Sequence, residues 1–161
     1  MKNKNQAGFS LIELLIVVAI IGIIAAIAIP NLLSSRRAAN EGSAQQSLRT
    51  LHSSEANYQV SFGSGNYGSL AQMGTQGLID PVLRTGAKSG YNFAVTTVDF
   101  VVGVSPATFY ATAVPQVTSG VGQSGTRRFG TSTDGVMHGD STALTAYANE
   151  AAVIAAPALG N

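Results

Sequence analysis

Apolar residues are concentrated near the N-terminus of this 161-residue chain. No side chain between Leu14 and Ile29 is polar, and the longer apolar run that starts at Phe9 is interrupted only by Ser10 and Glu13. At 1.5 Å per residue, about 21 such residues make a helix of roughly 31 Å, close to the thickness of the hydrocarbon core of a bilayer. The pattern therefore predicts a helix of membrane-spanning length at this end of the chain.

A different pattern follows this run. In residues 31–62, apolar side chains recur at spacings of three, four and seven, or sums of these, with polar residues between them. This periodicity is typical of an amphipathic helix, so we expect the N-terminal helix to continue and to end at Phe62–Gly63. The expected stripe consists of Ala38, Ala44, Leu48, Leu51, Tyr58 and Phe62, and the expected soft points are Asn31, Ser34, Ser35 and Gly42.

Residues 63–161 predict a head domain, so the expected fold class is α+β. Segments rich in β-branched and aromatic residues alternate here with Gly, Pro and Ser, as in short strands joined by turns. Because these strands follow one another closely, we expect an antiparallel meander with one face on the long helix. Short helices are expected within 69–84, and the Ala-rich tail from Thr142 is left open between a helix and a mobile segment. The expected strands are 91–98, 100–104, 109–114, 127–131 and 136–138.

Composition argues against several classes of function. The formal net charge is +1, which gives no reason to expect a nucleic-acid or polyphosphate partner. The chain has no cysteine, and this excludes thiolate metal sites, a cysteine nucleophile and disulfide bonds. We expect no enzymatic activity, no cofactor and no bound metal.

Two Gly-containing segments resemble nucleotide-binding motifs only in their letters. Residues 63–68 match G-x-G-x-x-G, but that site requires a preceding strand and an acidic residue about 20 positions later. Here the segment follows a predicted helix, and Asp80 comes too soon. Residues 86–89 lack the Gly-Lys pair of a phosphate-binding loop. We interpret both segments as loops.

The polar residues of the head give no clear catalytic or metal-binding pattern. His52 and His138 are expected at the surface, because nothing in their spacing suggests a Ser-His-Asp site. Asp134 and Asp140, which is followed by Ser141, are too few for a calcium site with six to eight oxygen ligands. We interpret them as turn residues.

The head has one pair of adjacent basic residues, Arg127 and Arg128. Charged side chains commonly protect the exposed edge of a sheet. The pair is therefore expected at a solvated edge and not in a binding site.

Glu13 is the residue that distinguishes the apolar run from an ordinary membrane anchor. A carboxylate within hydrocarbon costs roughly 2.5–3.5 kcal/mol, and no basic side chain lies within one or two helical turns of it. Cleavage after Gly8 would create an α-amino group on Phe9, positively charged at neutral pH. This amine could pair with Glu13 within one helix, or between two staggered helices. In the second case, neutralisation of the membrane charge would depend on docking into a polymer.

The segment Gly8-Phe9-Ser10-Leu11-Ile12-Glu13, with the apolar run that ends at Ile29-Pro30-Asn31, resembles the class III leader and N-terminal helix of type IV pilins and pseudopilins. The resemblance covers about the first 35 residues. It implies a pilin-like α+β fold with four parts: a leader (residues 1–8), a transmembrane and filament-core helix (9–30), its amphipathic continuation (31–62) and a head (63–161).

The resemblance also implies a mode of processing and assembly. A prepilin peptidase would cleave between Gly8 and Phe9, and Phe9 would be N-methylated. The precursor would cross the inner membrane once, and an assembly platform with its ATPase would then extract it into a filament of pilin subunits at the cell surface. Assembly would depend on Phe9, Glu13, Gly22 and Pro30, with Glu13 pairing to a neighbour's amine and the helix loosening between Gly22 and Pro30.

Alternatives remain open on the sequence alone. The subunit could belong to a pilus, or to a pseudopilus of type II secretion or DNA uptake. A single-pass anchored domain that binds a partner without polymerising is a third possibility. Ala26-Ile27-Ala28 also fits a secretory cleavage site, although the apolar run is longer than is usual for such a signal.

Overall fold

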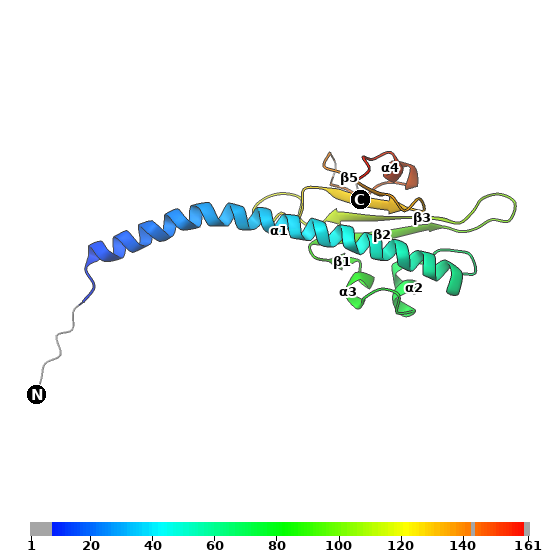
Figure 1. Ribbon diagram of the computed structural model, residues 1–161, viewed down its shortest axis with the longest axis horizontal. Helices are drawn as coiled ribbons and strands as arrows, with labels where there is room; N and C mark the ends of the chain where they lie inside the picture. The colour runs from blue at the N-terminus through cyan, green and yellow to red at the C-terminus, as the bar shows by residue number, and fades with distance from the viewer. Residues whose placement is uncertain (1–7, 143, 160–161) are drawn as a thin grey trace, which may run out of the picture. The chain divides into compact units, whose positions relative to one another are not determined.

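The computed structural model describes residues 8–142 and 144–159. It has two compact units, one ending at Ser35 and the other beginning at Arg36. The first unit contains the N-terminal part of helix α1 (Leu11–Ser61), and the second contains the rest of that helix and the head (Figure 1). The predicted long helix is therefore present and ends two residues before Gly63.

Helix α1 is continuous through every position at which softening was expected. Pro30 lies inside it, and Asn31, Ser34, Ser35 and Gly42 are all helical. A proline removes one backbone hydrogen bond, but the surrounding Ala, Leu, Ile and Arg residues favour the helical conformation. The expected soft points do not interrupt the helix in the isolated chain.

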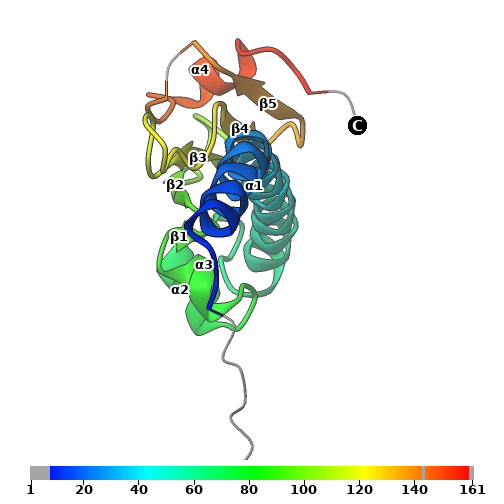
Figure 2. The same cartoon turned by 90° about the vertical axis from the view of Figure 1, so that its left-hand side faces the viewer.

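The head contains one five-stranded antiparallel sheet in the order β1-β2-β3-β4-β5. This is the predicted meander, and it confirms the α+β fold class. Figure 2 shows helices α2 and α3 beside the β1 edge and α4 toward the β5 edge. The strands are β1 (Ala87–Lys88), β2 (Tyr91–Val98), β3 (Thr108–Pro115), β4 (Arg128–Ser132) and β5 (Met137–Asp140), and the short helices are α2 (Leu70–Thr75), α3 (Pro81–Arg84) and α4 (Glu150–Ile154).

The short helices begin where the sequence supplies capping residues. Ser69 and Gln72 form a reciprocal capping box at the start of α2. Asp80, predicted as a turn residue, is the N-cap of α3, and Pro81 occupies its first turn. Asn149 caps α4 in the tail, which the sequence had left open.

The segment 100–104 was predicted as a strand, and this is wrong. It forms the turn between β2 and β3, with only an isolated bridge between Val101 and Ser105. Gly103, at φ 73°, and Pro106 reverse the chain here, so the valines on either side of Gly103 cannot extend a strand. The strand β1 was not predicted, because a two-residue strand carries almost no periodic signal.

The core lies between the second half of α1 and one face of the sheet. From the predicted stripe, Ala44, Leu48, Leu51 and Tyr58 are buried. Ala38 and Phe62 are exposed, because they lie near the two ends of the packed part of the helix. The sheet and the short helices contribute the other large core residues, among them Met73, Leu83, Tyr91, Phe93, Phe109 and Phe129.

Polar residues of α1 are also buried in this interface, which the periodicity did not predict. Glu41, Ser47, Ser54 and Glu55 are all less than a tenth exposed. Glu41 accepts hydrogen bonds from the backbone and side chain of Thr126, both at 2.8 Å, and pairs with Arg127 at 2.9 Å. The helix is therefore fixed to the head by a polar contact as well as by its apolar stripe.

Candidate functional site

The predicted processing site lies immediately before α1. Gly8 and Phe9 are outside the helix, and Phe9 is 94% exposed. A Cβ added to Gly8 would meet no atom within 4 Å. The peptide bond between these residues is therefore accessible in the isolated chain, as a protease substrate must be. Residues 1–7 of the expected leader lie outside the described residues.

Glu13 has a partner in the isolated chain that sequence reasoning missed. Its Oε2 accepts the Ser10 backbone N–H at 2.8 Å, and the Ser10 Oγ accepts the Glu13 backbone N–H at 3.3 Å. This reciprocal arrangement is a capping box, which satisfies two of the unpaired N–H groups at a helix start. Its signal was present in the sequence as Ser-x-x-Glu before an apolar run. The carboxylate thus has a local role before any pairing with another molecule.

The N-terminal part of α1 carries an uncovered apolar surface. Every large apolar side chain from Phe9 to Leu32 is at least half exposed. The helix is long and apolar enough to cross a membrane, with a mean hydropathy of 3.1 in its most apolar window. Such a surface is unfavourable in water and is stable only in lipid or against other protein.

The other predicted assembly residues, Gly22 and Pro30, lie further along the same helix. Gly22 follows Glu13 by nine residues, which is roughly 14 Å of helix. A Cβ added to Gly22 would meet nothing within 4 Å, so its small size is not required by the isolated chain. The structure does not bring Gly22 and Pro30 into contact with Glu13.

The G-x-G-x-x-G segment is a packed loop. The Gly68 N–H donates to Glu55 Oε2 at 2.8 Å, and a Cβ at Gly63 or Gly68 would collide with its surroundings, which at Gly68 are the Tyr58 ring. Gly68 is needed for close packing against Tyr58 of α1, and Gly63 for the close approach of the Asn66 backbone within the loop. The interpretation of this segment as a loop is confirmed.

The expectation of two surface histidines is wrong for His138. This side chain is 5% exposed, its Nδ1 lies 2.7 Å from the Ala156 carbonyl, and its Nε2 lies 3.6 Å from Asp134 Oδ2. Burial results from the C-terminal tail, which covers β5 through a bridge to Ala158. His52 is half-buried, with its ring centroid 5.7 Å from that of Phe109. Within the described residues, no group of three or more His, Asp or Glu side chains could hold a metal ion.

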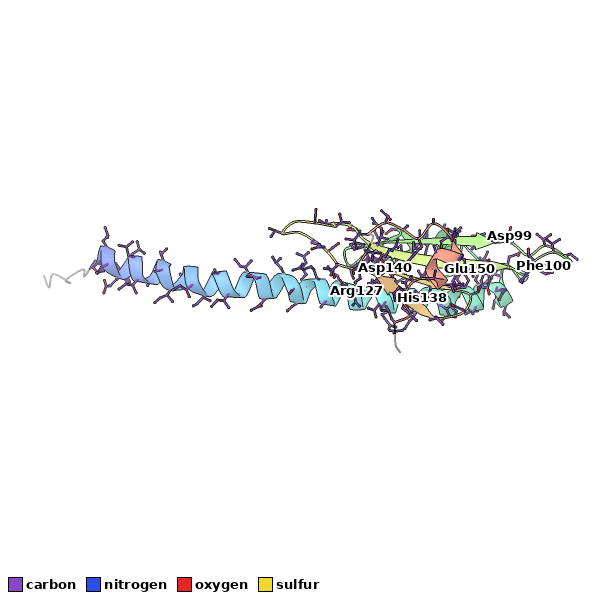
Figure 3. The ribbon with its side chains drawn as sticks, turned by 90° about the horizontal axis from the view of Figure 1, so that it is seen from above. Asp99, Phe100, Arg127, His138, Asp140 and Glu150 are labelled. Carbon is purple, nitrogen blue, oxygen red and sulfur yellow. The ribbon has the colours of Figure 1, made fainter. Side chains whose placement is uncertain are left out.

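The expectation of a solvated basic edge is also wrong, above all for Arg128. Its side chain is 15% exposed, pairs with Asp140 at 2.9 Å and lies 4.0 Å from the Tyr147 ring centroid. The Tyr147 hydroxyl also donates to Asp140, and burial, with the Asp140 carboxylate beside it, raises the pKa of Tyr147 to about 12. Asp140 is thus more than a turn residue: it fixes the segment between β5 and α4 to the sheet. Asp140 is labelled in Figure 3, within the head.

Comparison with known proteins identifies the N-terminal segment. Residues 3–29 match the family model described as "Prokaryotic N-terminal methylation motif". The chain is 45% identical over 56 residues to the type IV major pilin protein PilA of Myxococcus xanthus, covering 35% of this chain and 26% of that protein. It is 63% identical over 38 residues to the type IV wide pilus major component PilA4 of Thermus thermophilus, covering 24% and 29%.

A third relative comes from a secretion system. The chain is 30% identical over 60 residues to the type II secretion system core protein G of Aeromonas hydrophila, covering 37% of this chain and 42% of that protein. The chain thus spans less than half the length of each of these relatives. No solved structure matches the chain significantly. The names of the relatives describe pilins and a secretion protein, not enzymes.

The fold and the N-terminal segment define a class of protein: an α+β head on a long helix whose N-terminal part is apolar and exposed. The methylation motif and the local similarity to two major pilins both lie in the N-terminal segment of this class. Over its N-terminal segment, this chain is thus similar to type IV pilins.

Proposed function

We propose that this protein is the structural subunit of a type IV pilus-like filament. The observation that carries the proposal is the coincidence of the methylation motif at residues 3–29 with an apolar helix surface that the isolated chain leaves uncovered. Lipid covers this surface in the precursor, and neighbouring copies cover it in the filament. The head then forms the outer part of the fibre.

Processing is the first step of the proposed function. A prepilin peptidase cleaves between Gly8 and Phe9, and Phe9 becomes N-methylated. The precursor resides in the inner membrane as a single-pass protein, and an assembly platform with its ATPase moves the mature chain into the filament. The accessible, non-helical peptide bond after Gly8 supports this order of events.

Glu13 controls docking in this proposal. In the isolated chain the carboxylate is occupied by the Ser10 N–H, which moderates the cost of a charge at the membrane. Pairing with the Phe9 amine of a neighbouring subunit then neutralises it fully. Gly22 and Pro30 allow the helices to approach closely and to loosen as they pack.

Mass spectrometry of the mature protein tests the processing step. We expect loss of residues 1–8 and the addition of one methyl group on Phe9. A mature chain that retains its leader would indicate a plain anchor instead. A cut after Ala28 would indicate ordinary secretion.

Two substitutions separate the charge of Glu13 from its capping role. Gln at the N3 position can still complete a capping box, whereas Ala cannot. We expect both Glu13→Gln and Glu13→Ala to insert into the membrane normally and to yield few sheared filaments. Ser10→Ala, which breaks only the cap, should retain the wild-type yield. Wild-type amounts of filament from Glu13→Gln would refute the pairing mechanism.

A secretion pseudopilus is the second candidate, favoured by the similarity to the Aeromonas hydrophila core protein G. The two functions differ in a deletion strain. Loss of surface fibres with normal protein export supports the pilus, and loss of export without loss of fibres supports the pseudopilus.

A further inference from the structure

The turn between β2 and β3 carries an exposed apolar surface, which we call the apolar tip. Its shape is fixed by backbone hydrogen bonds between Val101 and Ser105 in both directions, each at 3.1 Å. The Phe100 N–H also donates to the Asn66 side chain at 2.7 Å, which ties the turn to the loop after α1. The tip is therefore an ordered feature of the head. Its members and their exposed fractions are Phe100 (53%), Val101 (49%), Val102 (83%) and Val104 (78%).

A hollow of about 240 Å³ lies at the other end of the sheet, and we call it the basal hollow. Arg36 and Asn40 of α1 form one wall, and the turn between β1 and β2 forms another. The loop between β3 and β4 completes it with Val117, which is 44% exposed. The same loop carries Val121, which is 79% exposed. The hollow thus combines a basic group with the apolar side chain of Val117, and Val121 is exposed on the same loop.

The two surfaces cannot meet within one molecule. The apolar tip precedes the first residue of β3, and the loop of the basal hollow follows its last. Eight residues of strand separate them, or roughly 25 Å at 3.4 Å per residue. Figure 3 shows Asp99 and Phe100 at one end of the head, and Arg127, the last residue of the β3–β4 loop, away from that end.

The two ends are also complementary in charge. Asp99 lies next to the apolar tip and is exposed, and Arg36 is exposed at the basal hollow. Among the described residues, neither forms a salt bridge. The two ends are therefore complementary: one has protruding apolar side chains and a carboxylate, and the other has a hollow and a guanidinium.

We infer that the apolar tip of one copy docks into the basal hollow of a second copy of this chain. Asp99 of one head then pairs with Arg36 of the next, while Val102 and Val104 pack against Val117 and Val121. Such a contact joins two different surfaces and repeats without closing, as filament growth requires. The inference rests on the proposed filament function, and it assigns the head a contact in addition to helix packing.

Cysteine cross-linking tests this contact, since the chain has no cysteine of its own. The full chain with Val102→Cys and Val121→Cys is expressed in filament-forming cells and treated with a mild oxidant. The two sites are too far apart for an intramolecular disulfide, which needs Cα atoms about 4.4–6.8 Å apart. We expect a ladder of covalent dimers, trimers and longer species on a non-reducing gel. Pairing Val102→Cys with Ala151→Cys on α4 is the matched control and should give no ladder.

Charge reversal in the doubly substituted chain adds a second readout. Asp99→Arg should lower the ladder yield several-fold, and adding Arg36→Asp should restore it. Both sites are exposed, so the head should keep its fold, which the near-ultraviolet signal of its tyrosines checks. No restoration by the double reversal would overturn the proposed pairing.

The outcomes separate this inference from the proposed function. Processed chains in normal filaments without a ladder overturn the tip contact and leave the filament role in place. A dimer from Val102→Cys alone that matches the yield of the pair indicates a tip-to-tip contact and also overturns it. If no filaments form, the same cross-linking is carried out on the full chain in detergent. A ladder then supports the tip contact, and the absence of a ladder overturns both the tip contact and the filament function.

Discussion

Glu55 should make the stability of the head depend on pH, and Glu55→Gln should remove that dependence. The side chain is fully buried in α1, where Oε2 accepts the Gly68 N–H at 2.8 Å. Its Oε1 has no hydrogen-bond partner among the described residues. Burial raises the pKa of Glu55 to about 7, and the Gly68 N–H offsets only part of this rise. A glutamine keeps the shape and the bond to Gly68 but carries no charge.

The size of the effect follows from the difference between the folded and unfolded pKa. One pKa unit corresponds to 1.36 kcal/mol, so a rise from 4.5 to about 7 corresponds to about 3 kcal/mol. Because the folded pKa is the higher one, the folded state binds the proton more tightly. The contribution to stability is therefore fully present below pH 4.5 and is lost as the pH rises through 7.

The assay is urea unfolding of the full chain in detergent between pH 4.5 and 8.5. All five tyrosines lie between residues 58 and 147, so their near-ultraviolet signal reports on the head and not on the apolar helix. We expect Glu55→Gln and the wild type to have similar unfolding free energies at pH 4.5. At pH 8.5 the variant should be more stable by about 3 kcal/mol.

Glu41→Gln is the matched control, since Glu41 is a second buried carboxylate on the same helix face. Burial raises its pKa, but the N–H and hydroxyl of Thr126 and the Arg127 guanidinium together outweigh burial, so the pKa of Glu41 is lowered. This variant should lose stability at neutral pH, and the loss should shrink in acid. A difference between Glu55→Gln and the wild type that does not change with pH would refute the reasoning.

Two further substitutions test packing in the head. Arg128→Ala should destabilise the head by about 3–5 kcal/mol, because the substitution leaves the Asp140 carboxylate in a largely buried site without its cation. Urea unfolding of this variant with the free energy of the wild type would contradict this prediction. Gly125→Ala should cost about 1–3 kcal/mol, because the new Cβ would collide with the buried Tyr91 hydroxyl, whereas Gly122→Ala has open space and should unfold like the wild type. Thermal unfolding of Gly125→Ala and Gly122→Ala, each compared with the wild type, checks this prediction.

The sequence predicted the elements whose signals are local and periodic. Strand β2 was predicted with the bounds that the structure has, because its aromatic and β-branched residues end at clear turn residues. The stripe of α1 was predicted at Leu48 and Leu51 for the same reason, since each repeats at the helical period. The processing segment was recognisable because a basic leader, Gly8, Phe9 and Glu13 occur together.

What the sequence did not predict depends on partners distant in the chain. A glutamate such as Glu55 is expected at the surface from sequence alone, but the loop at Gly68 covers it. Arg128 was expected at a sheet edge, but Asp140 and Tyr147 contact its side chain. The apolar segment 100–104 looked like a strand because composition cannot tell a buried strand from an exposed turn tip. The Ser-x-x-Glu pattern at Ser10 and Glu13 predicts the capping role of Glu13, but we interpreted this residue only as a charge in the membrane.

The order of the sheet has a consequence for the folding of the head. Each strand pairs with the strand that precedes it in the chain, so no pairing waits for a distant segment to arrive. Pairing between successive strands keeps the sequence separation between contacting residues short, which favours faster folding than in sheets with long-range pairings. If the head crosses a membrane as in the proposed function, it can therefore add strands one at a time onto α1 as it emerges. Strand edges that are exposed during folding are then short-lived, which limits aggregation.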